Sequence, residues 1–455
     1  MTQVETVADW RDAVGRVLAS GGRFAAGWAS AGQWRAAFET AGTLRVLSTP
    51  AADAPTIVDL VEAAAWDERE AHDLAGLRFE GHAPLRALVA HPDQGWTTPV
   101  TGDGVHEVAV GPIHAGVIES GHFRFHTVGD RVLAMDPRLF YKHRGLEQAA
   151  RGRDPEAALA HVQRACAACA VTNTVAYAQA VEDALGLWPD RDLRVARTTL
   201  LELERLYNHL HDIGALCAGV GFAAGTMAFA ALKERAQRLN ARLCGHRFLF
   251  GTIAVGRGVF VPADSARADL RDLRADAAAA WRELEFATSL QARLDGVGVL
   301  TREDALRLGT VGPAARASGV REDAREHSPR LWYGGFVPAR PLQERGDVAA
   351  RLQVRAAELT TTFELLDDLL AHPAGAGAVS AQAPAGSVGV GRVECPRGAT
   401  TCAVELRSGR IARIRLRTAS YANWPAVAHA AAGCLLPDFP LINKSFELCY
   451  ACVDR

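Results

Sequence analysis

Two pairs of cysteines are the residues whose type and spacing point most directly to chemistry. Cys166 and Cys169 form one C-x-x-C pair, and Cys449 and Cys452 form a second pair close to the last residue. Residues three apart share one face of a helix, so each pair can offer two thiolates to one metal ion. Together they form a soft site that suits zinc, nickel, iron or an iron–sulfur cluster. Zinc ribbons join their pairs over roughly 15–20 residues, and the longer separation here disfavours a small zinc knuckle without excluding zinc.

The remaining cysteines occur singly among apolar neighbours, and we interpret them as small buried side chains rather than ligands. They are Cys217, Cys244, Cys395, Cys402 and Cys434. The odd total of nine cysteines, and an N-terminal stretch without the basic and apolar regions of a signal peptide, favour a reducing compartment over a disulfide framework.

The composition is that of a globular protein. Of the 455 residues, 49% are hydrophobic and 22% are charged, which excludes a disordered or collagen-like chain. Lys and Arg total 50 against 52 Asp and Glu, so we expect no nucleic-acid partner. Residues 213–232 carry no charge over a length that could span a bilayer. They are rich in Ala and Gly, and we expect a buried helix–loop segment.

The elements that must position the cysteines are predicted to form an α+β protein in two parts. Residues 1–94 mix short helical and strand patterns and are expected to form a small α+β domain. Residues 95–110 contain turn signals typical of a linker. Residues 111–455 are expected to form a large, mainly helical domain with peripheral β-strands.

Within the larger domain, apolar residues recur at helical spacing in long segments. The predicted helices cover 155–187, 192–216, 229–250, 265–294 and 348–370. A β-hairpin is predicted within 106–135, and strands over 393–418. Residues 372–392 are rich in Gly, Ala and Pro and predict a loop, but GSVGVGR (386–392) lacks the strand–helix context of a phosphate-binding loop.

At the cysteine motifs the sequence resembles the large subunit of nickel–iron hydrogenases, in the membrane-associated class related to respiratory complex I (the formate hydrogenlyase and hydrogenase-4 type). That family carries R-x-C-x-x-C early and C-x-x-C just before its C-terminus, here Arg164 to Cys169 and Cys449 to Cys452. Blocks around them match in order. They are GPIHAGVIESGHFRF (111–125), YKHRGLE (141–147), LELERLYNHLHDIG (201–214), VECPRG (393–398) and DFPLINKSFELCYACVDR (438–455).

The first part of the chain has a resemblance of its own. WDEREAHDLAGLRFEGHAPLR (66–86) resembles the 30-kDa subunit of complex I, which this hydrogenase class can carry fused ahead of the large subunit. Residues 111–455 resemble the hydrogenase large subunit and the 49-kDa subunit of complex I. The resemblance therefore covers nearly the whole chain and implies the same two-part fold.

The resemblance implies that the cysteines hold a nickel–iron centre. Cys166, Cys169, Cys449 and Cys452 are then the nickel ligands, and Cys169 and Cys452 also bind the iron, which carries CO and cyanide. Such a centre interconverts H2 with protons and electrons, and Cys449 is expected to accept the proton.

Two further residues match catalytic positions of the family. Glu119 matches a proton-transfer glutamate, whose pKa would be raised by burial beside a thiolate; the alternative is a surface carboxylate at a strand turn. Arg397 of E-x-P-R-G is expected to overhang the metal site as a fixed cation; the alternative is an ordinary ion pair, for example with Glu394. His143, Arg144 and Glu147 are expected to orient the helix bundle or to face an electron-transfer partner; the alternative is a structural ion-pair network.

The sequence departs from the family pattern at three positions. Ala167 replaces the usual Gly, Asn173 replaces a common His, and Leu448 replaces the Pro before the third cysteine. None of these changes removes a thiolate, but Asn173 puts the hydrogen bonding around the site in doubt.

The resemblance also implies partners. We expect an iron–sulfur small subunit with a 4Fe–4S cluster, membrane subunits of a complex I-like assembly, and maturation proteins. The chain would then lie in the cytoplasm, held on the cytoplasmic face of the membrane by its partners. Two alternatives stay open: a metal-free quinone-reductase-related subunit, which typically lacks the paired cysteines, and a scaffold subunit with a structural zinc ion.

Overall fold

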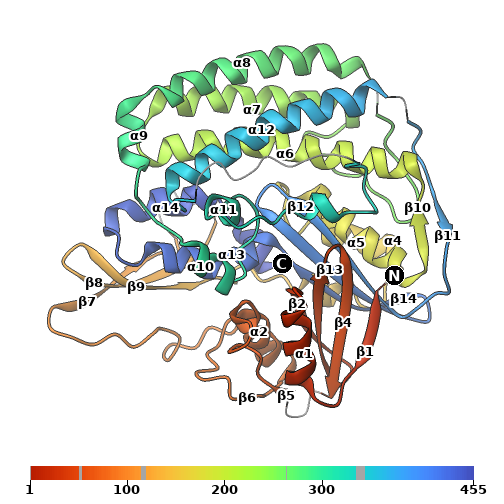
Figure 1. The fold of residues 1–455 in the computed structure, drawn as a ribbon, viewed down its shortest axis with the longest axis horizontal. Helices are drawn as coiled ribbons and strands as arrows, with labels where there is room; N and C mark the ends of the chain where they lie inside the picture. The colour runs from red at the N-terminus through yellow and green to blue at the C-terminus, as the bar shows by residue number, and fades with distance from the viewer. Residues whose placement is uncertain (1, 51–53, 114–118, 263, 335–343, 373) are drawn as a thin grey trace.

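The structure is a computed structural model that describes residues 2–50, 54–113, 119–262, 264–334, 344–372 and 374–455. It combines helices and separate open sheets, which confirms the predicted α+β class. A layer of long helices lies on one side, a twisted sheet crosses the middle, and the N-terminal elements cover the other side of that sheet (Figure 1).

The N-terminal elements form a small sheet in the order β1-β4-β3-β2, with α1 packed against it. α1 begins after Asp9, whose side chain accepts a hydrogen bond from the Asp12 amide. Its buried face carries Trp10 and Val14, so the helix covers an apolar core around Trp34. The elements are β1 (Gln3–Thr6), α1 (Trp10–Ala19), β2 (Arg23–Ser30), β3 (Gln33–Thr40), β4 (Thr43–Pro50), β5 (Ala54–Pro55), α2 (Ala65–Ala75) and β6 (Phe79–Glu80).

The helical layer is built on α6, which packs against both α7 and α12. Aspartates cap α6 and α12 at their N-termini: Asp190 accepts from the Leu193 amide and Asp347 from the Ala350 amide. The helices of the body are α3 (Leu146–Ala149), α4 (Pro155–Gln163), α5 (Ala170–Ala184), α6 (Arg191–Gly219), α7 (Ala223–Cys244), α8 (Arg267–Glu285), α9 (Thr288–Leu294), α10 (Arg302–Arg307), α11 (Gly312–Ala317), α12 (Val348–Ala371), α13 (Ala419–Ala431), α14 (Phe439–Phe446) and α15 (Tyr450–Asp454).

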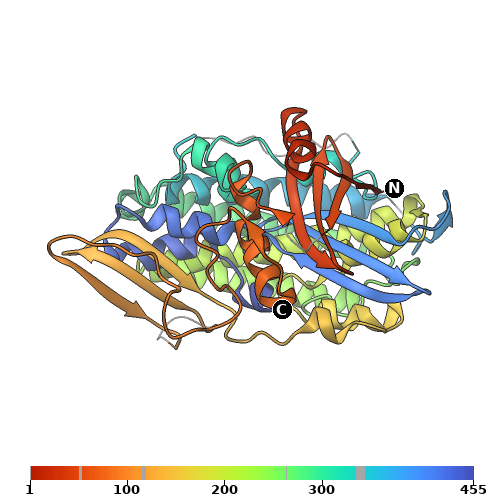
Figure 2. The same ribbon diagram turned by 90° about the horizontal axis from the view of Figure 1, so that it is seen from below.

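The strands of the body form small antiparallel sheets. The hairpin predicted within 106–135 is part of a three-stranded sheet that projects at one edge of the molecule (Figures 1 and 2). The strands are β7 (Val105–Val110), β8 (His122–Val128), β9 (Arg131–Arg138), β10 (Leu187–Pro189), β11 (Val379–Ala381), β12 (Val388–Cys395), β13 (Gly398–Arg407) and β14 (Arg410–Arg417).

The sheet β12-β13-β14 lies between α5 and the N-terminal sheet, and all of β13 except Arg407 is buried. The predicted loop over 372–392 ends earlier than expected, because β12 already begins at Val388. Two glycines of this stretch serve packing. A Cβ at Gly389 would lie 2.1 Å from the Ala180 carbonyl oxygen, and one at Gly391 equally close to that of Ala176, so glycine lets β12 lie directly against α5.

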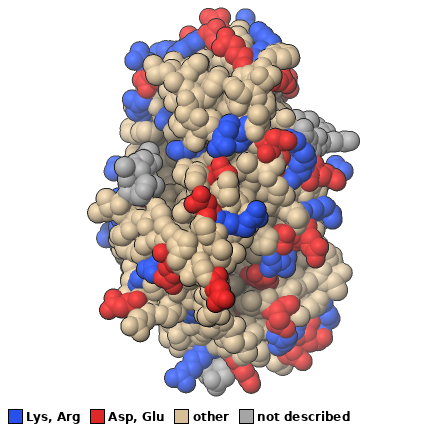
Figure 3. Space-filling view, turned by 90° about the vertical axis from the view of Figure 1, so that its left-hand side faces the viewer, with Lys and Arg blue, Asp and Glu red and all other residues tan. Residues whose placement is uncertain are grey.

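The uncharged segment 213–232 forms the end of α6, a turn and the start of α7, as expected, but it is only partly buried, since Met227 is 73% exposed. Among the described residues no helix is both long and apolar enough to cross a bilayer. Acidic and basic side chains are interspersed on the face that carries the end of the β7–β9 sheet (Figure 3).

Candidate metal centre

The two cysteine pairs, far apart in the sequence, meet in the folded chain. The Sγ atoms of Cys166 and Cys449 lie 3.1 Å apart. Those of Cys166, Cys169 and Cys452 all lie within 4.8 Å of one another, and all three residues are buried. Cys449 is half-buried and packs against the same cluster. Four thiols at these separations can bind one soft metal ion, so the donor set fits a thiolate-held metal.

Each pair lies at the start of a helix rather than within one, so the continuous helix predicted over 155–187 is wrong. α4 ends at Gln163, Cys166 lies in the connecting turn, and Cys169 is the residue before α5. The second pair repeats the arrangement, with Cys449 directly before α15 and Cys452 in its first turn. The N-terminal ends of helices favour negative charge, which stabilises thiolates there.

Side chains of α6 hold the first cysteine loop in place. Asn208 donates a hydrogen bond of 2.8 Å to the Ala168 carbonyl. The carboxylate of Glu204 accepts from the amides of Val171 (2.7 Å) and Thr172 (3.0 Å), the free N–H groups at the start of α5. The LELERLYNHLHDIG block therefore supports the loop on which Cys166 and Cys169 lie.

The YKHRGLE block contacts both cysteine segments. Arg144 donates to the carbonyls of Arg164 and Ala165, each at 2.9 Å, directly before Cys166. Its backbone amide donates to the Arg455 carbonyl at 2.8 Å. These contacts agree with the expected orienting role of the block. The block orients the two cysteine-bearing loops, however, and not the helix bundle.

The thiols divide into two kinds. Hydrogen bonding from Cys166 lowers the pKa of the Cys169 and Cys449 thiols well below the usual value, and the Arg397 cation adds to this effect. The same hydrogen bonds raise the pKa of Cys166 and Cys452. Cys169 and Cys449 are therefore disposed to ionise, the state that metal ligation requires, whereas Cys166 and Cys452 hold their protons more tightly.

Arg397 lies over this cluster at the turn between β12 and β13. Its Nη1 atom is 3.9 Å from the Cys169 sulfur and 2.9 Å from the Asn208 side-chain oxygen. Its Nη2 atom is 3.4 Å from the Asp212 carboxylate, and its Nε donates to the Glu447 carbonyl. The guanidinium is thus fixed by contacts on several sides.

Glu394, which the sequence suggested as an alternative ion-pair partner of Arg397, pairs with a different arginine. Glu394 pairs with Arg316 at 2.9 Å. Burial raises the pKa of Glu394 to about 7, and the Asp323 charge acts in the same direction.

Glu119 lies on the other side of the cluster, beside the second pair. Its Oε2 accepts a hydrogen bond of 2.9 Å from the Ala451 amide, between Cys449 and Cys452. Burial raises the pKa of Glu119 to about 7, and the negative charge of Cys449 contributes. Part of the block around it, residues 114–118, lies outside the described residues.

Cys395 was interpreted from the sequence as a small buried side chain. It is buried, but its thiol hydrogen-bonds with Cys169 and its sulfur accepts from the Arg397 amide at 3.2 Å. It therefore lies next to the metal ligands. Nothing in its spacing indicates this position, which depends on the β12–β13 turn.

Asn173 is fully buried one turn into α5, with its backbone amide donating to the Cys169 carbonyl at 3.0 Å. Within the described part of the chain neither polar atom of its side chain has a hydrogen-bond partner. Leu448, at the other departure from the family pattern, packs into an apolar core with Phe446 and Val453.

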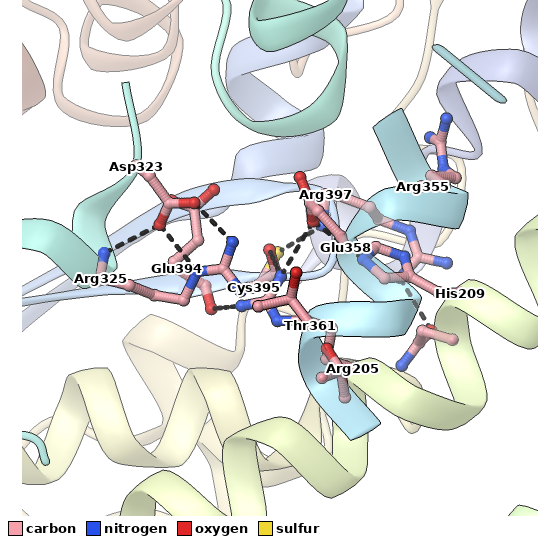
Figure 4. A network of polar contacts seen from close by, with 12 residues as sticks. Arg205, His209, Asp323, Arg325, Arg355, Glu358, Thr361, Glu394, Cys395 and Arg397 are labelled. Carbon is pink, nitrogen blue, oxygen red and sulfur yellow. Dashed lines mark hydrogen bonds and ion pairs between the residues drawn. The ribbon is translucent and has the colours of Figure 1, made fainter. Parts of the chain in front are cut away.

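A buried network of charged residues extends from Arg397 into the helical layer (Figure 4). His209 lies 3.0 Å from Glu358, which also accepts from Arg316 at 2.8 Å. Arg316 in turn lies 3.2 Å from Asp323. Residues 300–345, where Arg316 lies, carry no recognisable sequence motif, because the partners of Arg316, Glu358 and Glu394, come from other elements.

Comparisons with known proteins agree with this site. The model of the family "Nickel-dependent hydrogenase" matches residues 144–243. That of "Respiratory-chain NADH dehydrogenase, 49 Kd subunit" matches residues 219–385 and 376–455, and that of the 30 Kd subunit matches residues 36–104.

Similar proteins cover most of the chain. Formate hydrogenlyase subunit 5 of Escherichia coli (strain K12) is 31% identical over 88% of this chain and 77% of its own length. The carbon monoxide-induced hydrogenase of Rhodospirillum rubrum is 29% identical over 77% of this chain and 99% of its own. Among solved structures, a chain of the archaeal membrane-bound sulfane sulfur reductase superposes with a TM-score of 0.71, at 26% identity, over 79% of this chain and all of that one.

The fold and the site thus define a subunit of the class shared by complex I and the nickel–iron hydrogenases. Within that class, the chain belongs to the family of nickel–iron hydrogenase large subunits related to complex I, with a 30-kDa-type segment ahead of the large-subunit part. It is an oxidoreductase that acts on H2.

Proposed function

We propose that this chain is the subunit in which H2 is cleaved or formed, at a nickel–iron centre held by Cys166, Cys169, Cys449 and Cys452. The observation that carries the proposal is the convergence of both cysteine pairs, with 3.1 Å between the sulfurs of Cys166 and Cys449. The thiolates of Cys166, Cys169, Cys449 and Cys452 would hold the nickel, and those of Cys169 and Cys452 would also hold the iron, which would carry CO and cyanide. When bound, the two metals would supply the site at which H2 is split into two protons and two electrons, or formed from them.

The chain's own residues then manage charge and protons. By analogy with the family, the Cys449 sulfur is the group that takes the proton. Glu119 relays that proton, because its carboxylate lies at the Ala451 amide and its pKa of about 7 lets it accept and release protons near neutrality. Arg397 stays protonated beside Cys169 and balances the negative charge of the thiolates.

Electrons must leave through a partner, and we propose an iron–sulfur small subunit with a 4Fe–4S cluster. The relatives named above support membrane subunits of a complex I-like assembly as further partners. On this proposal the chain lies on the cytoplasmic face of the membrane, and maturation proteins deliver the metals.

Elemental analysis and infrared spectroscopy of the purified complex test the proposal. We expect one nickel and one iron per chain, with infrared bands of iron-bound CO and cyanide and with H2-dependent activity. Cys449→Ser should abolish activity, whereas Cys244→Ser, a thiol away from the cluster, should not. Zinc alone, without the infrared bands, would favour the scaffold alternative. A metal-free complex that still transfers electrons would favour the quinone-reductase alternative.

A further inference from the structure

The last residue of the chain is buried between two parts of the molecule. Arg455 is 2% exposed. Its guanidinium lies 2.7 Å from the Glu70 carboxylate and 3.3 Å from that of Glu147, and it donates to the Leu416 carbonyl. Glu70 belongs to α2 of the N-terminal elements, and both ribbon views place the C-terminus beside this helix (Figures 1 and 2).

The acidic face of α2 is bound to the body by more than this one pair. Glu70 also pairs with Arg415 of β14. Asp67, one turn earlier, pairs with Arg415 at 2.8 Å and with Arg417 at 2.9 Å. All these side chains are buried, so Asp67 and Glu70 of the WDEREAHDL motif face β14 and Arg455 rather than solvent.

The segment attached to Arg455 is short and is held from its other side as well. Asp454 accepts from the amides of Phe140 (2.7 Å) and Lys142 (2.8 Å), and His143 bonds to the Asp454 carbonyl at 2.6 Å. Cys452 is only two residues before Asp454 in the single helical segment α15. A shift of Arg455 would therefore be transmitted through α15 to Cys452 and Cys449.

We propose that Glu70 is a positioning residue for the metal centre: through Arg455 it fixes α15, and with it the second cysteine pair. The N-terminal elements are then part of the scaffold of the site and not only an attachment for partners. This inference rests on the proposed function in one respect, that Cys449 and Cys452 hold the metal.

The test compares two buried glutamates of α2 in the complete purified complex. Glu70→Gln removes the charge that faces Arg455. Glu68→Gln is the matched control, because Glu68 is equally buried but accepts from Thr56 and Ile57 within the N-terminal elements. Hydrogen exchange followed by mass spectrometry reports the mobility of the peptide 447–455. We expect Glu70→Gln to speed exchange in this peptide by about tenfold and Glu68→Gln to leave it unchanged.

A spectroscopic readout links mobility to the metal. In Glu70→Gln we expect the bands of iron-bound CO and cyanide to shift or broaden at the nickel content that remains, while Glu68→Gln keeps the wild-type bands. If Glu70→Gln prevents assembly, Arg455→Gln removes the other partner of the pair and should loosen the same peptide. Unchanged exchange in both the Glu70→Gln and Arg455→Gln complexes, or equal loosening by Glu68→Gln, would overturn the inference. Failure of the proposed function would instead show as absence of nickel from the wild-type complex.

Discussion

Glu119 and Arg397 lie on different sides of the thiol cluster and differ in what they can do with a proton. Arg397 keeps its charge, because Asp212 and the nearby thiolates raise its pKa against the effect of burial. Burial and the negative charge of Cys449 raise the pKa of Glu119 to about 7, where the group can exchange protons. Arg397 is therefore suited to act as a fixed positive charge, and Glu119 to carry protons.

Replacing Glu119 by Gln should slow proton transfer without removing metal. A positioned acid–base group typically contributes about 10²–10⁴-fold, so we expect H2/D2O exchange to fall by at least about 100-fold while nickel content stays at the wild-type level. Glu107→Gln, at an exposed carboxylate of β7, is the control. Exchange near the wild-type rate in Glu119→Gln would contradict the relay role.

The same carboxyl group predicts a pH dependence of stability. The pKa of Glu119 is raised from 4.5 to about 7 in the folded chain, so the folded state binds this proton more tightly than the unfolded state. Its contribution to the free energy of unfolding should therefore decrease as pH rises from about 4.5 to 7. Thermal unfolding over this range should show a smaller decrease in Glu119→Gln than in the wild type, and parallel curves would contradict the assignment.

Replacing Arg397 by Lys keeps the charge but loses the planar group that reaches Asn208, Asp212 and the Glu447 carbonyl together. Loss of one preorganised electrostatic group costs about 10²–10³-fold in related chemistry, and we expect a fall of that order in activity per bound nickel. Arg407→Lys, at the exposed end of β13, should have no effect. Wild-type activity in Arg397→Lys would show that charge alone suffices.

The four cysteines that meet in the structure could be singled out at the residue scale because both pairs keep a spacing that has chemical meaning. Cys395 could not, because it enters the site from the turn between two strands whose pairing no local pattern reveals. Arg316 was missed for the same reason: its carboxylate partners Glu358 and Glu394 lie on other elements, α12 and β12.

At the scale of elements, α6 and α12 were predicted almost to their ends because their apolar spacing is local. The helix predicted over 229–250 begins and ends earlier, as α7, and the one predicted over 265–294 is two helices, α8 and α9. The break between α4 and α5 was missed, since the sequence RACAACAVTNTVA continues with alanine and small apolar residues that also suit a helix. What ends α4 is not local: Arg144, Asn208 and Glu204 satisfy the backbone groups that the break leaves free. These contacts arise only after the body has folded.

Glu204 is therefore expected to support the start of α5. Replacing it by Ala leaves the amides of Val171 and Thr172 buried without acceptors, at a cost of about 1–3 kcal/mol for each buried group left unpaired. We expect a lower free energy of unfolding and faster hydrogen exchange in residues 166–175. Glu234→Ala, on the exposed face of α7, is the control. Unchanged exchange in this peptide would exclude the supporting role.

At the scale of the whole molecule, the parts are joined by buried polar groups as well as apolar cores. Glu405 of β13 accepts from the Trp28 indole at 2.8 Å and the Ser30 hydroxyl at 2.7 Å, across the contact between the N-terminal sheet and the body. The two-part organisation could be expected from the sequence. The extent of the contact between the N-terminal sheet and the body could not, because it depends on which faces of the strands pack together.

Glu358 makes the corresponding connection within the body, between α12, α6 and α11. Although burial opposes ionisation, Arg316 and His209 hold the pKa of Glu358 well below 4.5. A carboxylate with a lowered pKa stabilises the folded state above its unfolded pKa and loses that contribution as pH falls. The contribution of Glu358 to the free energy of unfolding of the wild type should therefore decrease as pH falls below about 4.5.

Glu358→Gln tests this connection because it leaves the buried Arg316 without one of its carboxylates. Breaking a buried ion pair on one side costs about 3–5 kcal/mol, so we expect a loss of that order at pH 7 and a smaller loss at pH 4, measured by unfolding at both pH values. Glu364→Gln, on the same helix but exposed, should change neither. An equal loss at pH 7 and pH 4 would mean that Glu358 acts through packing rather than charge.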